Sequence, residues 1–145
     1  MRSFTPKYSS FENKVRESFN QQGVMKTLNS SLVSITPGQV EIEFAYQQNL
    51  TQQNGYIHAG ILTTVLDNAC GYAALSLMPE NDDVVSIEFK VNLLSPALGE
   101  KMIAIGTVRK PGRTITVTEG ELFAYDGGEK KLIALMTGTF MSIRV

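Results

Sequence analysis

The sequence is poor in several residue types on which protein chemistry often depends. Its 145 residues include one histidine, one cysteine and no tryptophan, and 13 basic against 14 acidic side chains leave a net charge of −1. A single cysteine, Cys70, excludes an internal disulfide and suits a reducing compartment. The single histidine, His58, has no partner at metal-ligand spacing, so we expect no metal and no cofactor. The basic residues are spread along the chain, which argues against a nucleic-acid partner.

Two further features of the sequence bear on cellular location and on membrane association. The first residues lack the apolar core of a secretion signal, so we expect a cytoplasmic protein. Residues 59–78 approach the length of a membrane span, but Asp67 and Asn68 lie at the centre of this run and no second span accompanies it. A helix buried in a globular protein explains the run better, and we expect no membrane partner.

The N-terminal residues predict a helix that docks on the rest of the protein. Phe11, Val15 and Phe19 recur at four-residue spacing, with Ser10 as a candidate N-cap and Gly23 as the end of the helix. Such a helix is amphipathic, and its apolar stripe needs a body to cover it.

The length and the order of elements predict a single α+β domain, residues 1–145, in which a helical extension (residues 1–27) precedes a core (residues 28–145). Turn residues separate the β-rich runs, which favours an antiparallel series of strands. The natural packing is one curved antiparallel sheet wrapped around a long apolar helix. The core is predicted to contain strands at 32–35 and 40–46, a helix at 58–78, and strands at 84–93, 101–109, 114–125 and 131–143.

From Val85 onward, the strand predicted at 84–93 alternates strictly between apolar and polar residues. We expect its apolar face to join the core, because such alternation is typical of a half-buried strand. The opposite face carries Ser86 and is expected to contact solvent or to take part in function. The apolar set is Val85, Ile87, Phe89, Val91 and Leu93.

Asp67 is the residue of the central helix that a packed core alone would not need. Burying a carboxylate is costly unless something compensates for it. At about 100° per residue, the neighbours of Asp67 on the helix surface are all small, which opens a slot for another backbone or a thin substrate. A structural role on the outer face of the helix is the alternative. The small neighbours are Gly60, Thr63, Thr64, Gly71 and Ala74.

The start of the same helix offers a second chemical feature. Its free backbone N–H groups and positive dipole end suit a carbonyl oxygen that gains negative charge. His58 precedes Asp67 by nine residues, so the two lie on nearly opposite faces and cannot form a dyad within one chain. Cys70 lies among apolar neighbours, and we interpret it as a core residue. An acid or base and an oxyanion site on one helix suggest acyl chemistry.

Element order and motif together resemble the hotdog fold and, within it, the PaaI-type acyl-CoA thioesterases. In that family an Asn-x-x-Gly-x-x-His-Gly-Gly turn opens the central helix, an Asp follows nine residues after the His, and a Ser lies on the next strand. The resemblance implies a dimer whose sheets join edge to edge, often paired again into a tetramer. The matching residues are Gln52, Gly55, His58, Ala59, Gly60, Asp67 and Ser86, followed by residues 94–96 and by Lys110, Gly112 and Arg113.

The resemblance also implies an activity, the hydrolysis of acyl-CoA thioesters, with coenzyme A entering as part of the substrate. The N–H groups of Ala59 and Gly60 would hold the thioester carbonyl, and Asp67 of the facing subunit would attack it or activate water. Ser86 would hold that water and Gln52 would orient it. Each active site would therefore be shared between two chains.

Further substrate contacts are expected near this motif and at a basic turn. Ala59 replaces the first Gly of the family pair and keeps its N–H, whereas Gln52 replaces Asn and is one methylene longer. Arg109, Lys110 and Arg113 flank a tight turn and would meet the phosphates of coenzyme A, or would simply be solvated. The expected substrate or CoA contacts are His58, Asn54, Thr64, Arg109, Lys110 and Arg113.

Two other functions compete with hydrolysis. A hydratase or dehydratase with the same fold is the nearest alternative. Those families have an Asp-x-Asn-Pro-x-His motif, or a His that a proline-rich segment separates from a Glu. The sequence has neither pattern. A non-catalytic protein that binds or senses acyl-CoA would keep the pocket and the subunit contacts without turnover. The departures at Gln52 and Ala59 leave this alternative open.

Overall fold

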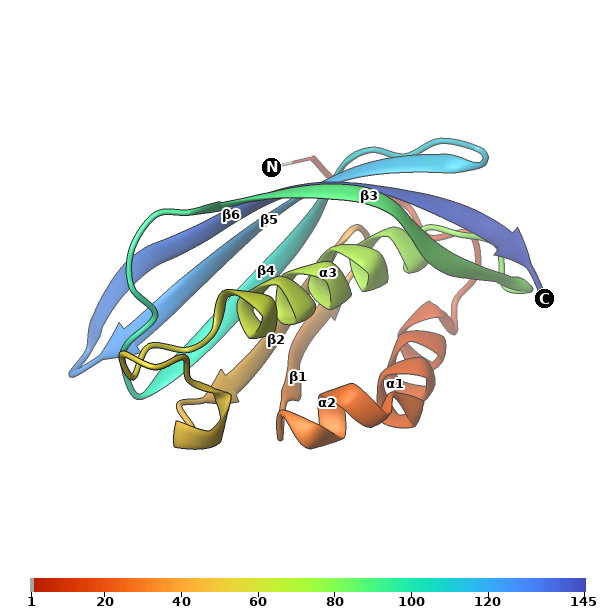
Figure 1. The fold of residues 1–145 in the computed structure, drawn as a ribbon. Coiled ribbons are helices and arrows are strands. Elements are labelled where there is room, and N and C mark those ends of the chain that lie inside the picture. Colours follow the sequence, from red (N-terminus) through yellow and green to blue (C-terminus); the bar gives the residue numbers. More distant parts are fainter. Residues whose placement is uncertain (1) are drawn as a thin grey trace.

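The computed structural model describes residues 2–145 and contains one six-stranded antiparallel sheet that curves around a long helix (Figure 1). This arrangement confirms the predicted hotdog fold. The strand order across the sheet is β1-β2-β4-β5-β6-β3, so β1 and β3 form its two edges. The elements are α1 (Phe11–Gln21), α2 (Gly23–Thr27), β1 (Ser31–Thr36), β2 (Gln39–Ala45), the 3₁₀ helix η1 (Gln48–Leu50), α3 (Ala59–Leu75), β3 (Asp82–Leu93), β4 (Lys101–Lys110), β5 (Ile115–Asp126) and β6 (Glu129–Arg144).

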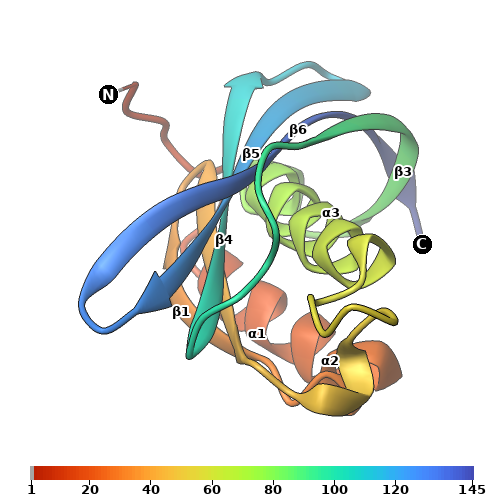
Figure 2. The same cartoon turned by 60° about the vertical axis from the view of Figure 1, so that its left-hand side comes forward.

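The N-terminal extension consists of two helices where the sequence predicted one. Gln22 adopts an extended backbone conformation and ends α1, and α2 then begins at Gly23, which was expected to end the helical segment. The buried side chains of α1 are the predicted apolar stripe. Ser10 precedes α1 as expected, but its side chain makes no capping hydrogen bond. Figure 2 shows α1 and α2 on the concave side of the sheet, beyond α3.

A lysine fastens this extension to the rest of the chain. The ammonium group of Lys14 on α1 donates hydrogen bonds to the backbone carbonyls of Pro79, Glu80 and Asp82, in the segment that connects α3 to β3. Backbone carbonyl oxygens are acceptors, and hydrogen bonds to them from a charged ammonium group are stronger than those from a neutral donor. The extension is therefore held against the same loop that leads into β3.

The central helix lies directly on the sheet because two facing strand residues are glycines. A Cβ atom at Gly106 of β4 would lie 2.3 Å from the carbonyl carbon of Ala69, and one at Gly120 of β5 would lie 2.9 Å from Cys70 Sγ. Any side chain at Gly106 would push the helix away. The helix covers residues 59–75, which is shorter than the predicted 58–78. Among the described residues, no helix combines the length and apolar character that crossing a membrane requires.

The prediction that the alternating apolar face of β3 joins the core was wrong for most of the strand, although Val91 packs against the core. The ladder between β3 and β6 shifts between Ser86 and Glu88, so Ile87 is an extra residue in a β-bulge. Ser86 lies opposite the buried Phe140 and therefore points toward α3. Because β3 is an edge strand with no neighbour beyond it, most of its apolar side chains stay exposed. Val85, Ile87, Phe89 and Leu93 are 38%, 50%, 45% and 55% exposed.

Candidate active site

The bulge in β3 brings Ser86 to the carboxylate of the central helix. Ser86 Oγ donates a hydrogen bond of 2.7 Å to Asp67 Oδ1, and both residues line a pocket of about 90 Å³ between α3 and β3. Burial raises the pKa of the Asp67 carboxyl, and the hydrogen bond from Ser86 opposes that shift. A carboxyl group whose pKa is raised accepts a proton at higher pH than an exposed one, which suits a general base.

The start of α3 is capped by the only histidine. His58 has an extended backbone, and its Nδ1 accepts the N–H of Gly60 at 2.8 Å. The sequence predicted that the N–H groups of Ala59 and Gly60 would both hold a carbonyl oxygen, but in this structure His58 occupies the second donor. The N–H of Ala59 is the donor left at this helix end within residues 2–145. Sequence reasoning missed the cap, although the position of His58 directly before the first helical residue was a usable signal.

A hollow of about 360 Å³ opens beside this helix end and contains the predicted Gln52 and Ala59. Gln52 Oε1 accepts a hydrogen bond from the backbone N–H of Asn54, so the side chain stabilises its own turn. Its amide NH₂ group makes no hydrogen bond within the described residues 2–145. Asn54 itself is exposed at the tip of the turn. The other residues that line this hollow are Tyr56, Ile57, Leu62 and residues 93–97.

The structure does not bring the two halves of the predicted site together within one chain. Ala59 and Asp67 are separated by eight residues of helix, which corresponds to about 12 Å along the axis. They line different hollows that share no residue. Thr64, which was expected to contact substrate, donates its hydroxyl to the carbonyl of Gly60 at 2.8 Å. A thioester held at Ala59 would therefore meet a carboxylate from elsewhere.

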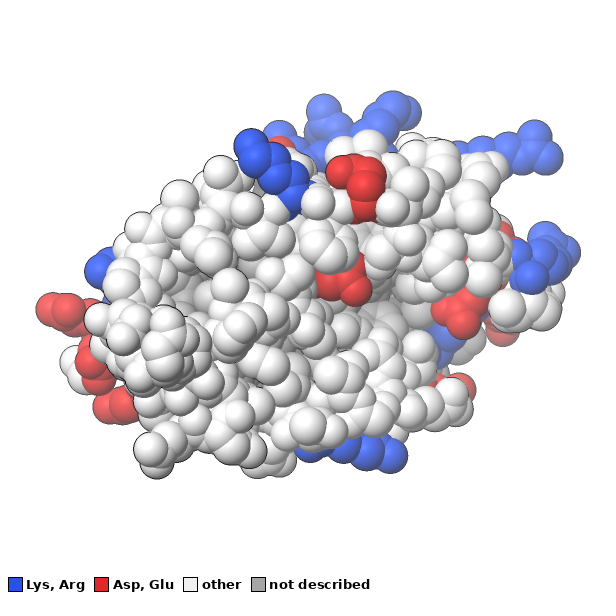
Figure 3. All heavy atoms as spheres, viewed as in Figure 1, with Lys and Arg blue, Asp and Glu red and all other residues white. Residues whose placement is uncertain are grey.

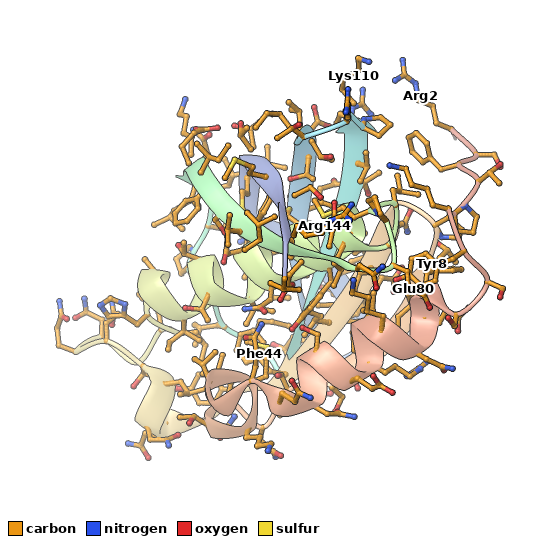
Figure 4. All side chains as sticks on the ribbon, turned by 90° about the vertical axis from the view of Figure 1, so that its right-hand side faces the viewer. Arg2, Tyr8, Phe44, Glu80, Lys110 and Arg144 are labelled. Atoms are coloured by element: carbon orange, nitrogen blue, oxygen red, sulfur yellow. The ribbon has the colours of Figure 1, made fainter. Side chains whose placement is uncertain are left out.

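The basic turn between β4 and β5 divides into two parts. Arg109 points to the outer face of the sheet, where its Nε lies 3.4 Å from a carboxylate oxygen of Glu119. Lys110 and Arg113 instead line a hollow of about 460 Å³ together with Lys7, a residue that sequence reasoning missed because it is distant in the chain. The N-terminal arm lies against this turn, since Arg2 donates to the carbonyl of Arg109 at 2.8 Å, and Figure 4 shows Arg2 close to Lys110.

Two negative findings narrow the chemistry of the described residues. Cys70 is buried, and this burial raises the pKa of its thiol to about 12, which confirms its interpretation as a core residue. Within residues 2–145, no three His, Cys, Asp or Glu side chains gather closely enough to hold a metal ion.

Comparison with known proteins decides the family. The sequence profile of the thioesterase superfamily matches residues 54–131, which include α3 and its preceding turn. The chain belongs to the thioesterase superfamily. A crystal structure of a thioesterase family protein from Silicibacter pomeroyi is 49% identical, with a TM-score of 0.92 over 93% of this chain and 99% of that chain.

Two further relatives extend the comparison of this thioesterase. Acyl-coenzyme A thioesterase 13 of Homo sapiens is 32% identical over 93 residues, which are 63% of this chain and 66% of that protein. The E. coli PaaI protein from the phenylacetic acid degradation operon has the same fold, with a TM-score of 0.82 and 19% identity over 92% of this chain and 94% of its own. The predicted resemblance to PaaI-type thioesterases is confirmed, and family membership supports thioester hydrolysis as the activity.

Proposed function

We propose that the protein hydrolyses acyl-CoA thioesters at sites shared between two copies of the chain. The observation that carries this proposal is the Ser86–Asp67 hydrogen bond, which holds a half-buried carboxylate in a pocket on the central helix of a thioesterase fold. A carboxylate held in this way has a fixed direction and a raised pKa. Both properties favour attack on a carbonyl carbon, either directly or through water.

The second copy of the chain supplies what one copy lacks. Ala59 and Asp67 lie too far apart along one helix to reach the same carbonyl group. The exposed apolar residues Val85, Ile87 and Phe89 on the edge strand β3 offer a surface that a second β3 would cover. Figure 3 shows broad uncharged areas on the face that carries α3 and β3, with acidic side chains near its centre. Pairing through this face would bring each Asp67 to the helix start of its partner.

The proposed reaction uses four groups. The N–H of Ala59 holds the thioester oxygen and stabilises the negative charge that develops on it. Asp67 of the other chain attacks the carbonyl carbon, or takes a proton from a water molecule that does so, while Ser86 orients the carboxylate. In the water route, the C–S bond then breaks and the proton that Asp67 took from water passes to the leaving thiolate, so the free acid and coenzyme A are released. In the direct route, the C–S bond breaks as an anhydride forms between the acyl group and Asp67. Water then hydrolyses this anhydride, which restores the carboxylate and supplies the proton for the thiolate. Gln52 is positioned to orient the water or the carbonyl through its free amide NH₂ group.

We also propose that Lys110 and Arg113 meet the phosphates of coenzyme A, with Lys7 as a third cation. The residues that line their hollow include these three cations and no carboxylate. Phosphate groups bind strongly to such convergent cations through charge-assisted hydrogen bonds. Arg109 is a weaker candidate, because Glu119 already accompanies it on the outer face of the sheet.

Thiol release from a panel of acyl-CoA thioesters tests this function. We expect wild-type protein to release coenzyme A, and Asp67→Asn to be at least about 100-fold slower, because loss of a general base or nucleophile has this scale of effect. Asp126→Asn provides a matched control, since Asp126 is exposed on the β5–β6 turn. Equal rates for wild type and Asp67→Asn would contradict the proposal.

One observation favours a second function, the binding of acyl-CoA without turnover. The N–H of Gly60 is engaged by His58 Nδ1, so the helix start presents fewer donors to a carbonyl than a two-donor oxyanion site needs. Thermal stabilisation by acyl-CoA without any thiol release would favour the binding protein.

A further inference from the structure

A polar cluster lines the Asp67 pocket on the side of the N-terminal extension. Gln22, at the break between α1 and α2, donates from Nε2 to Asn68 Oδ1 at 2.6 Å and to the hydroxyl of Tyr72 at 2.7 Å. All three residues line the same pocket as Asp67 and Ser86. None of them is needed for the reaction proposed above, and sequence reasoning assigned none of them to the site.

The hydrogen bonds fix the orientation of the Gln22 amide. Asn68 Nδ2 donates to the carbonyl of Thr64 at 3.0 Å, so Asn68 Oδ1 is the acceptor and Gln22 must present its NH₂ group to it. Both hydrogens of that NH₂ group are then used. Within residues 2–145 no donor engages Gln22 Oε1, so a residue that lines the pocket carries an amide oxygen that can accept a hydrogen bond. Ser18 lies 3.2 Å from the Tyr72 hydroxyl and links the cluster back to α1.

The position of the cluster relates it to the acyl group of a bound thioester. Asn68 and Tyr72 are one helical turn apart on α3, and Asn68 directly follows Asp67. A carbonyl carbon within reach of Asp67 would thus place the nearby atoms of its acyl chain along this wall. The other walls are apolar or lack a side chain, and are formed by Gly71, Val84 and Phe140.

We propose that Gln22 is a specificity-determining residue that selects short acyl groups bearing a hydroxyl. This inference rests on the proposed function of the Asp67 site. The hydroxyl donates to Gln22 Oε1 and replaces the water that otherwise solvates this oxygen. A plain alkyl group covers the oxygen without a replacement hydrogen bond, and unpaired polar groups are costly. The volume of about 90 Å³ is smaller than the cavity of about 150 Å³ that holds a benzene ring, which favours a short aliphatic group.

The proposal predicts a change in the ratio of the kcat/KM values for two substrates. This ratio separates an effect on specificity from a general loss of activity, which would lower both values alike. We would measure kcat/KM for butanoyl-CoA and for its terminally hydroxylated analogue with wild type, Gln22→Leu and Gln22→Asn. Wild type is expected to prefer the hydroxylated substrate. The preference should fall about 3- to 10-fold in Gln22→Leu, the scale of one neutral hydrogen bond. Gln22→Asn should keep part of it, because it retains an amide.

The matched control is Gln21→Leu, which makes the same change at an exposed neighbouring residue at the end of α1. It should leave the ratio as in wild type. An equal loss on both substrates in Gln22→Leu would assign Gln22 to structure alone and overturn the proposal. An unchanged ratio, or a wild-type preference for the plain acyl group, would also overturn it.

A binding measurement distinguishes failure of this inference from failure of the proposed hydrolysis. The dissociation constants of the same two CoA thioesters can be compared in wild type and Gln22→Leu whether or not either is hydrolysed. If no thiol is released but Gln22→Leu loses the binding preference, the selection of hydroxylated acyl groups stands and hydrolysis fails. If turnover is normal and neither ratio responds to Gln22→Leu, hydrolysis stands and the inference fails.

Discussion

At the scale of single residues, the protonation of Asp67 depends on its burial and on its hydrogen bond with Ser86. The carboxyl group is half-buried, and its only hydrogen bond in the described chain comes from Ser86. Burial disfavours the charged form, so the pKa is raised despite that hydrogen bond. The ionised form of Asp67 is therefore less favourable in the folded protein than the same carboxylate is in water.

This cost predicts that Asp67→Asn stabilises the fold at neutral pH. The pKa is higher in the folded than in the unfolded chain, so the unfavourable contribution is absent below the unfolded pKa and grows as pH rises through both values. The melting temperature of Asp67→Asn should exceed that of wild type more at neutral than at acid pH. Thermal melts across a pH series, with Asp126→Asn as the exposed control, measure this difference. A difference independent of pH would show that ionisation of Asp67 is not its cause.

The donor at the helix start can be removed with little disturbance. Ala59 is the first residue of α3, a position at which proline is well tolerated, and His58 already has the extended backbone that a residue before proline prefers. We expect Ala59→Pro to fold normally, because proline lacks only the N–H. Thiol release should fall by about 100- to 1,000-fold, as for other oxyanion donors. Ala59→Ser, which retains the N–H, is the control, and full activity in Ala59→Pro would exclude this donor.

At the scale of elements, the contact between α3 and the sheet limits what the strands tolerate. Gly106→Ala would place a Cβ 2.3 Å from the backbone of Ala69, and backbone cannot move as a side chain can. We expect a loss of at least about 1–3 kcal/mol in the free energy of unfolding, measured by urea denaturation. Gly23→Ala at the start of α2 meets no atom within 4 Å and should change stability little. Equal effects of the two substitutions would contradict this packing.

The sequence predicted regular elements better than their interruptions. The apolar periodicity of α1, α3 and most strands predicted the elements, because such a pattern marks the face that meets the core, whereas the edge strand β3 was an exception. The bulge at Ile87 could not be predicted, because an extra residue leaves the alternation of the sequence intact. In the structure, this bulge turns Ser86 toward Asp67. The same limit explains Gln22, which joins the site only through the break between α1 and α2. Hydrogen bonds between distant segments have no periodic signal.

At the scale of the whole molecule, the apolar edge strand predicts self-association. Phe89 on β3 is 45% exposed. Val33 on β1, at the opposite edge of the sheet, is exposed to a similar extent, 46%. We expect Phe89→Glu to weaken the dimer and to lower thiol release in parallel, because a buried unpaired charge is costly at an interface. Light scattering coupled to size exclusion would measure the mass. Val33→Glu serves as the control, and dissociation by this variant instead would assign the interface to the other edge.

The measurement that tests the shared site most directly is subunit complementation between Ala59→Pro and Asp67→Asn. Each variant alone carries one defect in both of its sites and should release little thiol. In a mixed dimer, one site combines an intact Ala59 from one chain with an intact Asp67 from the other. Random mixing should therefore restore roughly a quarter of the wild-type rate, because half of the dimers are mixed and each has one complete site. No gain on mixing, with mixed dimers verified by mass, would place both groups in the same chain and contradict the account.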